Sequence, residues 1–203
     1  MQGLSLRFNP VLKLLTFSDV FLWAGYYMMN ATVAIYLEQK FGMDSIETIS
    51  AGFAIYLVSR SIMMIPVAEF LDKHKTYVDE TWAIAMGCFL SGICIYMYIF
   101  ITQPWHLYLI QIFFGFAIAL NLPAWRKAMA KFIDKGYEAT EYTIYDIINS
   151  LLIAAMTAIG GVIVKNYGGF TALFVVAGSV AIIGAFVSMY LLKNRRIQHE
   201  YRQ

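Results

Sequence analysis

Three ionisable residues lie inside long apolar stretches of this 203-residue chain: Asp19, Arg60 and Asp146. A charge in the core of a membrane costs several kcal/mol unless it is paired or hydrated, so such residues mark ligand pathways, proton relays or ion pairs. We expect Arg60 to bind an anion or to act as a switch charge, with a structural ion pair to Asp19 or Asp146 as the alternative. Both aspartates are candidates for proton transfer, because a carboxylate in apolar surroundings takes up a proton more readily. They are otherwise caps or partners of Arg60.

Aromatic and amide side chains accompany these charges at helical spacing. From Asp19 onward the polar positions follow at intervals of four, four and three residues, and Tyr56 precedes Arg60 by four. Residues three and four apart share one face of a helix. The residues predicted to line a solute cavity with Arg60 are Trp23, Tyr27, Asn30, Tyr56, Asn121, Tyr145 and Asn149. The alternative for the tyrosines and asparagines is hydrogen bonding between packed helices.

The elements that must position these residues are six apolar runs, each at or above the ~20 residues that a helix needs to cross a membrane. They cover roughly 11–37, 46–70, 81–102, 105–125, 141–165 and 169–192. A hydrophobic content of 60% and a mean hydropathy of +0.63 exceed the usual range of a soluble domain. The sequence therefore predicts an all-α polytopic membrane protein with six transmembrane helices.

Positive charge falls almost entirely on one side of the six runs. Of the fifteen Lys and Arg residues, only Lys40 and Lys165 lie opposite the others, and Arg60 lies within a run. By the positive-inside rule, both termini are predicted to be cytoplasmic, in a bacterial-type cytoplasmic (inner) membrane. The basic tail is interpreted as a topology anchor that contacts anionic lipid, and binding of nucleic acid is not expected.

No pattern in the sequence points to enzyme chemistry, to a cofactor or to a metal site. Cys88 and Cys94 are six residues apart on different helix faces, so we expect free buried thiols. None of the three histidines has a metal-ligand neighbour at the i+4 position. A nucleophile–base pair and a phosphate-binding glycine loop are also missing.

Short loops join the runs, so residues 1–203 are predicted to form a single transmembrane domain. The longest connection, 126–140, is basic and separates two three-helix groups at about 11–102 and 105–192. Because each group holds three spans, the second group must enter from the opposite side, which predicts a 3+3 inverted repeat. Polar stripes predict that the first, second, fourth and fifth runs face an interior and that the third and sixth face lipid.

Three segments resemble the major facilitator superfamily, and more narrowly one six-helix half of that fold. FSDVFLWAGYYMMNATVAIYLEQKFG is similar to the first helix of the family, and QIFFGFAIALNLPAWRKAMAKFIDKG to its fourth. AEFLDKHK resembles the cytoplasmic motif after the second helix, where Asp72 and Lys73 match while Ala68 and Lys75 replace two glycines. The resemblance implies that Asp72 and Lys73 belong to a gating loop that packs against a partner half.

The resemblance further implies secondary active transport of a small solute by alternating access. Members of the superfamily normally hold two six-helix halves in one chain, related by an axis along the membrane normal. Six helices of fixed sidedness therefore predict a parallel homodimer with an isologous interface. The predicted partners are a small-molecule substrate, with anions among the candidates, the lipid bilayer and a second copy of the chain.

Two departures from the family pattern limit the mechanism. The fourth-helix arginine that the family links to proton coupling falls at Gln111, and Met156-Thr157 replaces the Gly-Pro of its antiporter pattern. Drug–proton antiport is therefore not favoured. The alternatives are a subunit of a heteromeric transporter or a non-transporting membrane scaffold that keeps the fold.

Overall fold

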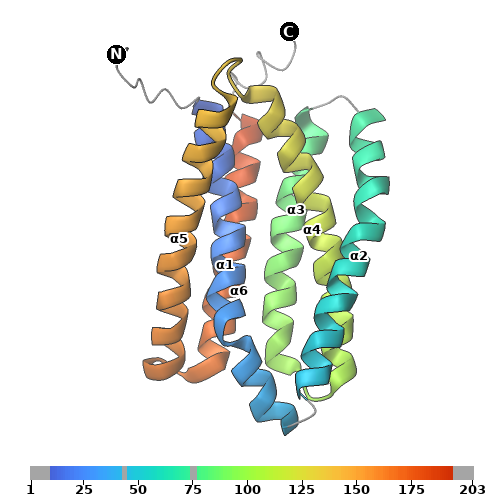
Figure 1. The fold of residues 1–203 in the computed structure, drawn as a ribbon, viewed down its shortest axis with the longest axis vertical. Coiled ribbons are helices and arrows are strands. Elements are labelled where there is room, and N and C mark those ends of the chain that lie inside the picture. The colour runs from blue at the N-terminus through green and yellow to red at the C-terminus, as the bar shows by residue number, and fades with distance from the viewer. Residues whose placement is uncertain (1–9, 43–44, 74–76, 194–203) are drawn as a thin grey trace.

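The computed structural model describes residues 10–42, 45–73 and 77–193, which form a bundle of long helices (Figure 1). The helices are α1 (Pro10–Phe41), α2 (Ser45–Lys73), α3 (Tyr77–Met97), α4 (Pro104–Phe132), α5 (Glu138–Asn166) and α6 (Gly169–Lys193), with a short 3₁₀ segment, η2 (Tyr98–Phe100), after α3. Six of these elements are long and apolar enough to cross a membrane. The prediction of an all-α fold with six membrane-spanning helices is confirmed, and the protein is an integral membrane protein.

Several helices continue beyond the apolar runs that predict them. α1 reaches Phe41, α2 reaches Lys73 and α4 reaches Phe132. Only residues 133–137 separate α4 from α5, so most of the connection expected over 126–140 is helical. Apolar side chains are required only in the hydrocarbon core, whereas the backbone hydrogen bonds of a helix can extend into the interface. Hydropathy therefore predicts the membrane-crossing part of each helix and not its full length.

Proline and glycine shape the ends of three helices. Pro104 lies in the first turn of α4, where its missing N–H group leaves no hydrogen bond unmade. Gly168 and Gly169 join α5 to α6 with φ angles of +102° and +69°, a left-handed backbone conformation that residues with a Cβ rarely adopt. These glycines allow a tight turn between two antiparallel helices.

Four helices form an inner set, and two lie at its sides. α3 packs against α6 and α4, and α6 also packs against α1. α5 packs mainly against α1, and α2 packs against α4, on opposite sides of the bundle (Figure 1). In the most apolar windows of α2 and α5 only 11% and 6% of residues are buried, against 50% in α3 and α4. α2 and α5 therefore each contact the inner set of helices through one narrow face and leave the rest of their surface exposed.

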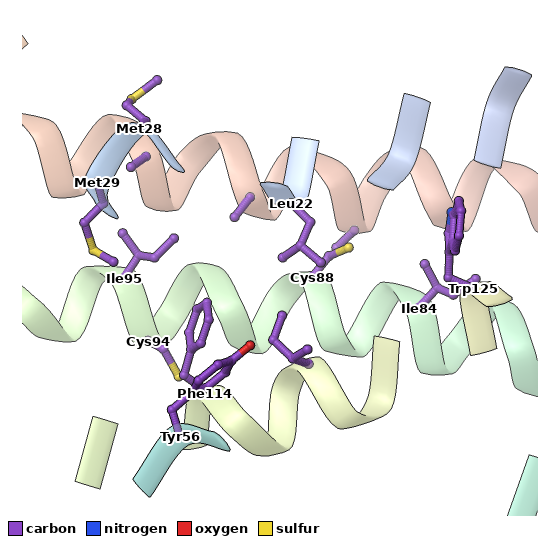
Figure 2. Close-up of a cluster of buried hydrophobic side chains, with 14 of the residues drawn as sticks. Leu22, Met28, Met29, Tyr56, Ile84, Cys88, Cys94, Ile95, Phe114 and Trp125 are labelled. Carbon is purple, nitrogen blue, oxygen red and sulfur yellow. The ribbon is translucent and has the colours of Figure 1, made fainter. Parts of the chain in front are cut away.

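α3 and α6 bury one side and leave the other side uncovered. Large apolar side chains such as Trp82, Phe89 and Phe186 are exposed on these two helices. That these sides face lipid stays a prediction from the sequence. The other sides of α3 and α6 form the core, where Figure 2 shows Cys88 and Ile95 of α3 lying near Leu22 and Met29 of α1, and Ile84 lying next to Trp125.

Small residues and thiols fill the contacts between these central helices. A Cβ on Gly25 of α1 would lie 2.5 Å from the Ala177 carbonyl oxygen of α6, and one on Gly92 of α3 would lie 2.8 Å from that of Gly178. Such residues let helix backbones approach closely in a membrane, where lipid removes the hydrophobic drive to associate. Cys88 and Cys94 are both free and buried, as predicted.

One end of the bundle, which we call the terminal end, holds the start of α1 and the end of α6 (Figure 1). α2 and α4 also end there, and α3 and α5 begin there. Asp19 lies toward the terminal end of α1, whereas Arg60 lies near the middle of α2. The two residues therefore stand at different depths.

Candidate functional site

The first of two polar clusters surrounds Asp19. Its carboxylate is only 1% exposed and accepts a hydrogen bond of 2.6 Å from the hydroxyl of Tyr145 on α5. One turn further along α5, Asn149 Nδ2 donates to the Tyr145 hydroxyl at 3.1 Å. The ring of Trp125 on α4 lies 4.6 Å from that of Tyr145. We call Asp19, Trp125, Tyr145 and Asn149 the Asp19 cluster.

The Asp19 cluster joins three helices through hydrogen bonds. Trp125 Nε1 donates to the Leu15 carbonyl oxygen of α1 at 3.4 Å. Hydrogen bonds to an ionised group are stronger than those between neutral groups, and they replace the water that burial removes. The cluster can therefore hold a carboxyl group inside the membrane without a cation beside it.

The second cluster surrounds Arg60, which is half-buried on α2. Its guanidinium lies over the ring of Tyr56, 5.4 Å from the centroid, and Nη1 donates to the Tyr56 hydroxyl at 3.3 Å. The Arg60 Nε atom is buried and has no hydrogen-bond partner among the described residues. The cation is thus stabilised mainly by one aromatic ring of its own helix.

Aromatic rings connect Tyr56 to α1 through α4. Tyr56 lies 5.7 Å from Phe114, and Phe114 stacks on Tyr26 of α1 at 5.3 Å. Tyr26 in turn lies 5.2 Å from Tyr27 and 5.9 Å from Trp23. Figure 2 shows Tyr56 and Phe114 lying next to each other in the core view. We call this set the Arg60 cluster, and its members are Trp23, Tyr26, Tyr27, Tyr56, Arg60 and Phe114.

The structure separates Arg60 from the two aspartates proposed as its ion-pair partners. Within residues 10–42, 45–73 and 77–193, no carboxylate oxygen lies within 4.0 Å of its guanidinium. Asp19 accepts its hydrogen bond from Tyr145, and Asp146 is exposed on α5. The structural ion pair is therefore not formed in this structure.

Two predicted cavity residues lie outside both clusters. Asn30 is exposed on α1. Asn121 is 1% exposed and donates to the Ile84 carbonyl oxygen at 3.3 Å and to Cys88 Sγ at 3.4 Å, both on α3. Asn121 is therefore turned into the contact between α4 and α3. Conversely, Tyr26 and Phe114 are central to the Arg60 cluster, although polarity gave no reason to single out Phe114.

Apart from these two clusters, an ion-paired group at the terminal end centres on Lys127 of α4. Its ammonium lies 3.2 Å from Glu80 Oε1 of α3 and 3.5 Å from Asp72 Oδ1 of α2, and it donates to the Leu71 carbonyl oxygen. Glu80 is only 1% exposed. Lys73 lies instead beside Glu69, where both side chains are largely exposed. Asp72 is thus held by α4, a contact that no local motif indicated.

Two apolar grooves lie away from the polar clusters. One, of about 490 Å³, lies between α2, α3 and α4, with Phe70, Trp82 and Met86 in its wall. The other, of about 360 Å³, lies between α3 and α4 beside Cys94 and Phe113. Neither includes a residue of the Asp19 or Arg60 cluster. In the parts of the chain that the structure describes, no three His, Cys, Asp or Glu side chains are placed to hold a metal ion.

Comparison with known proteins gives the context for this arrangement. The chain is similar to the "Uncharacterized transporter YwbF" of Bacillus subtilis (strain 168), with 24% identity over 145 residues. That alignment covers 70% of this chain and 36% of the relative, so it spans well under half of the relative's length. The sequence profile of the Major Facilitator Superfamily matches residues 7–202. Because this match covers nearly the whole sequence, the chain belongs to the Major Facilitator Superfamily.

Proposed function

We propose that this chain is a six-helix unit of a secondary active transporter that moves a small solute across a membrane by alternating access. Membership of a superfamily of membrane transporters and the name of the similar protein support a transport role. The observation that carries the proposal is a partly uncovered polar surface on α1, α2 and α5, inside membrane-spanning segments. We call it the polar surface, and its members are Trp23, Tyr27, Asn30, Arg60, Tyr145, Asp146 and Asn149.

Polar groups at membrane depth are costly when they face lipid, so the polar surface needs a cover. A second six-helix unit placed against α2 and α5 would provide one and would leave a hydrated cavity between the units. We propose a parallel homodimer, in which the same surface of both copies meets around a two-fold axis. Arg60 would then occur twice, once from each copy.

The packing of the helices supports the proposed 3+3 inverted repeat. Exchanging α1 with α4, α2 with α5 and α3 with α6 converts the α1–α6 contact into the α4–α3 contact. The same exchange converts the α1–α5 contact into the α4–α2 contact and leaves the α3–α6 contact in place. Inverted repeats of this kind place a solute site between two groups that rock against each other.

We further propose that the terminal end lies in the cytoplasm of a bacterial-type cell, with the chain in its cytoplasmic (inner) membrane. Lys13, Arg126, Lys131 and Lys135 belong to this end, whereas Lys40 and Lys165 belong to the opposite end. The excess of Lys and Arg at one end is the signal on which the positive-inside rule is based.

Within this proposal the two clusters take different roles. Arg60 contacts the solute, with Trp23, Tyr27 and Tyr56 beside it, and Asn30 lines the path along α1. Asp19 carries a proton, Tyr145 and Asn149 position it, and exposed Asp146 is a second candidate carrier.

The terminal-end contact of Asp72 with Lys127 forms and breaks as the unit opens and closes. Lys73, which is largely exposed beside Glu69, joins the same loop contact with the second unit.

Reconstitution tests the proposal directly. Purified chain in proteoliposomes is assayed for solute-driven currents on a solid-supported membrane, over a panel of organic anions, sugars and organic cations. Native mass spectrometry of the same preparation in nanodiscs gives the number of copies. We expect a two-copy assembly and a current for at least one solute class. A stable single copy without any current would contradict both the homodimer and the transport role.

Orientation has its own test with a matched pair of cysteine variants. Lys135→Cys at the terminal end and Lys165→Cys at the opposite end are both exposed, while the native Cys88 and Cys94 are buried. In intact cells, a membrane-impermeant maleimide should label Lys165→Cys and spare Lys135→Cys. The reverse pattern would contradict the proposed orientation.

A further inference from the structure

We propose that the Arg60 cluster binds an organic anion that carries a single carboxylate on a planar aromatic body. The inference rests on the proposed transport function and names its substrate class. It uses rings of α1, α2 and α4 that are linked to Arg60 through Tyr56 by successive ring contacts.

The charge of the ligand follows from what surrounds Arg60. The guanidinium has a ring and one long hydrogen bond as its described partners, and its Nε donor is unmatched. A guanidinium is always charged and offers a planar set of donors that fits a carboxylate through two parallel hydrogen bonds. A carboxylate on the ligand would therefore neutralise a charge that is otherwise costly at this depth.

A ligand with one negative charge matches the single positive charge of the Arg60 cluster. Arg60 is its only ionised member at neutral pH, since the remaining members are Trp, Tyr and Phe. Asp19 is buried and already accepts a hydrogen bond from Tyr145, so it does not extend the site toward a ligand cation. A dianion would bring a second charge for which the cluster has no partner.

The guanidinium of Arg60 is also not needed to hold α2 against α4. α2 is held against α4 by Ser59 Oγ, which donates to the Ile112 carbonyl oxygen at 2.9 Å, and by close backbone approach at Gly115. A Cβ on Gly115 would lie 2.8 Å from the Tyr56 carbonyl oxygen. The helix contact is therefore complete without the guanidinium.

The planar body follows from the rings that accompany the cation. Tyr27 is exposed and Trp23 is half-buried, and both lie on the α1 side of the Tyr26–Phe114 stack. Aromatic rings pack on one another in stacked or edge-to-face arrangements with centroids about 4.5–7 Å apart, so such a surface favours a flat ring over a saturated one. A neutral sugar, by contrast, offers no charge to the guanidinium of Arg60.

Three matched probes separate charge from planarity. The chain in nanodiscs is titrated calorimetrically with 2-naphthoate, with its neutral analogue 2-naphthamide and with the saturated decahydro-2-naphthoate, and empty nanodiscs correct for partition into lipid. We expect 2-naphthoate to bind at least about tenfold more tightly than either analogue, a difference that corresponds to one good charged hydrogen bond or one ring contact. Equal affinity for 2-naphthamide would overturn the inference.

Variants assign the binding to the cluster. Arg60→Gln should weaken 2-naphthoate at least about tenfold, and Arg60→Lys should weaken it less because charge persists while the planar fork is lost. Tyr56→Leu should reduce the preference for the aromatic probe, and Arg126→Gln, at an exposed position of α4, is the control. Unchanged affinity in both Arg60 variants with intact thermal unfolding would overturn the inference.

Binding and uptake, measured separately, test the substrate class and the transport role independently. Binding of 2-naphthoate without uptake into proteoliposomes would uphold the inference and contradict transport. Uptake of other solutes without naphthoate binding would overturn the inference and uphold transport. If Arg60→Gln splits the native assembly into single copies, the partner of Arg60 is a protein carboxylate and the inference is overturned.

Discussion

The Asp19 and Arg60 clusters both place an ionisable residue inside the membrane, yet they surround it in opposite ways. Asp19 is buried and receives a 2.6 Å hydrogen bond from another helix. Arg60 is half-buried and has its described contacts with Tyr56, one turn away on the same helix. The carboxyl group of Asp19 is thus hydrogen-bonded by the fold, whereas the guanidinium of Arg60 keeps donors without a partner among the described residues.

The difference shows in how each outer helix is attached. α5 is joined to α1 by the Tyr145–Asp19 hydrogen bond and by Thr157 Oγ1, which donates to the Tyr27 carbonyl oxygen at 3.4 Å. α2 is joined to α4 by Ser59, by close approach at Gly115 and, at the terminal end, by the Asp72–Lys127 pair, whereas the guanidinium of Arg60 takes no part. Asp19 helps to hold α5 against α1, whereas Arg60 holds no helix in place and is therefore available for a ligand.

The largest expected effect is on transport through Arg60. Arg60→Ala should reduce solute uptake by about 100-fold, because hydrogen bonds to a charged group contribute ~1.5–3 kcal/mol and each 1.4 kcal/mol is a factor of ten. Uptake is measured in proteoliposomes, and native mass and thermal unfolding should stay close to those of the parent. Arg126→Ala is the control, and uptake at the parent rate in Arg60→Ala would remove Arg60 from the site.

Overpacking one glycine should loosen the contact between α5 and α1. A Cβ on Gly160 would collide with the Met28 carbonyl oxygen of α1, whereas one on the adjacent Gly161 meets nothing within 4 Å. We expect Gly160→Val to lower the free energy of unfolding by ~1–3 kcal/mol, the range of overpacked contacts. Gly161→Val should be neutral, and equal loss in both variants would show that α5 does not depend on this contact.

A double-mutant cycle measures the attachment through Asp19. Asp19→Asn and Tyr145→Phe should show a coupling energy of about 1 kcal/mol in unfolding free energy, in the upper part of the range for hydrogen bonds between membrane helices. The same cycle between Asp19→Asn and Tyr56→Phe should give about zero, because these residues belong to different clusters. Comparable coupling in both cycles would mean that the clusters act as one.

The smallest effect is expected at the Tyr56 hydroxyl. Tyr56→Phe removes a hydrogen bond of 3.3 Å but keeps the ring beneath the guanidinium. Anion affinity should change by less than about threefold, since the bond is long and the cation–π contact remains. A loss as large as that of Arg60→Gln would assign the hydroxyl a direct ligand contact.

The sequence alone determined the features that depend on local order. Hydropathy over ~20-residue windows gives membrane spans, and all six runs are helices in the structure. The helical repeat of 3.6 residues predicts which side chains are neighbours on one helix. Tyr56 and Arg60, four residues apart, are in contact as this spacing predicts. The sidedness of Lys and Arg and the profile match follow from order along the chain as well.

Only the tertiary structure decided which helices meet and which residues face each other across them. In the structure Asp19 is hydrogen-bonded to Tyr145 and does not pair with Arg60. Asn121 donates to α3, and Lys127 pairs with buried Glu80. These choices depend on the rotation and depth of each helix against its neighbours, and close approach at small residues such as Gly25, Gly115 and Gly160 sets both. A one-dimensional pattern records the face of a helix but not the partner that the face meets.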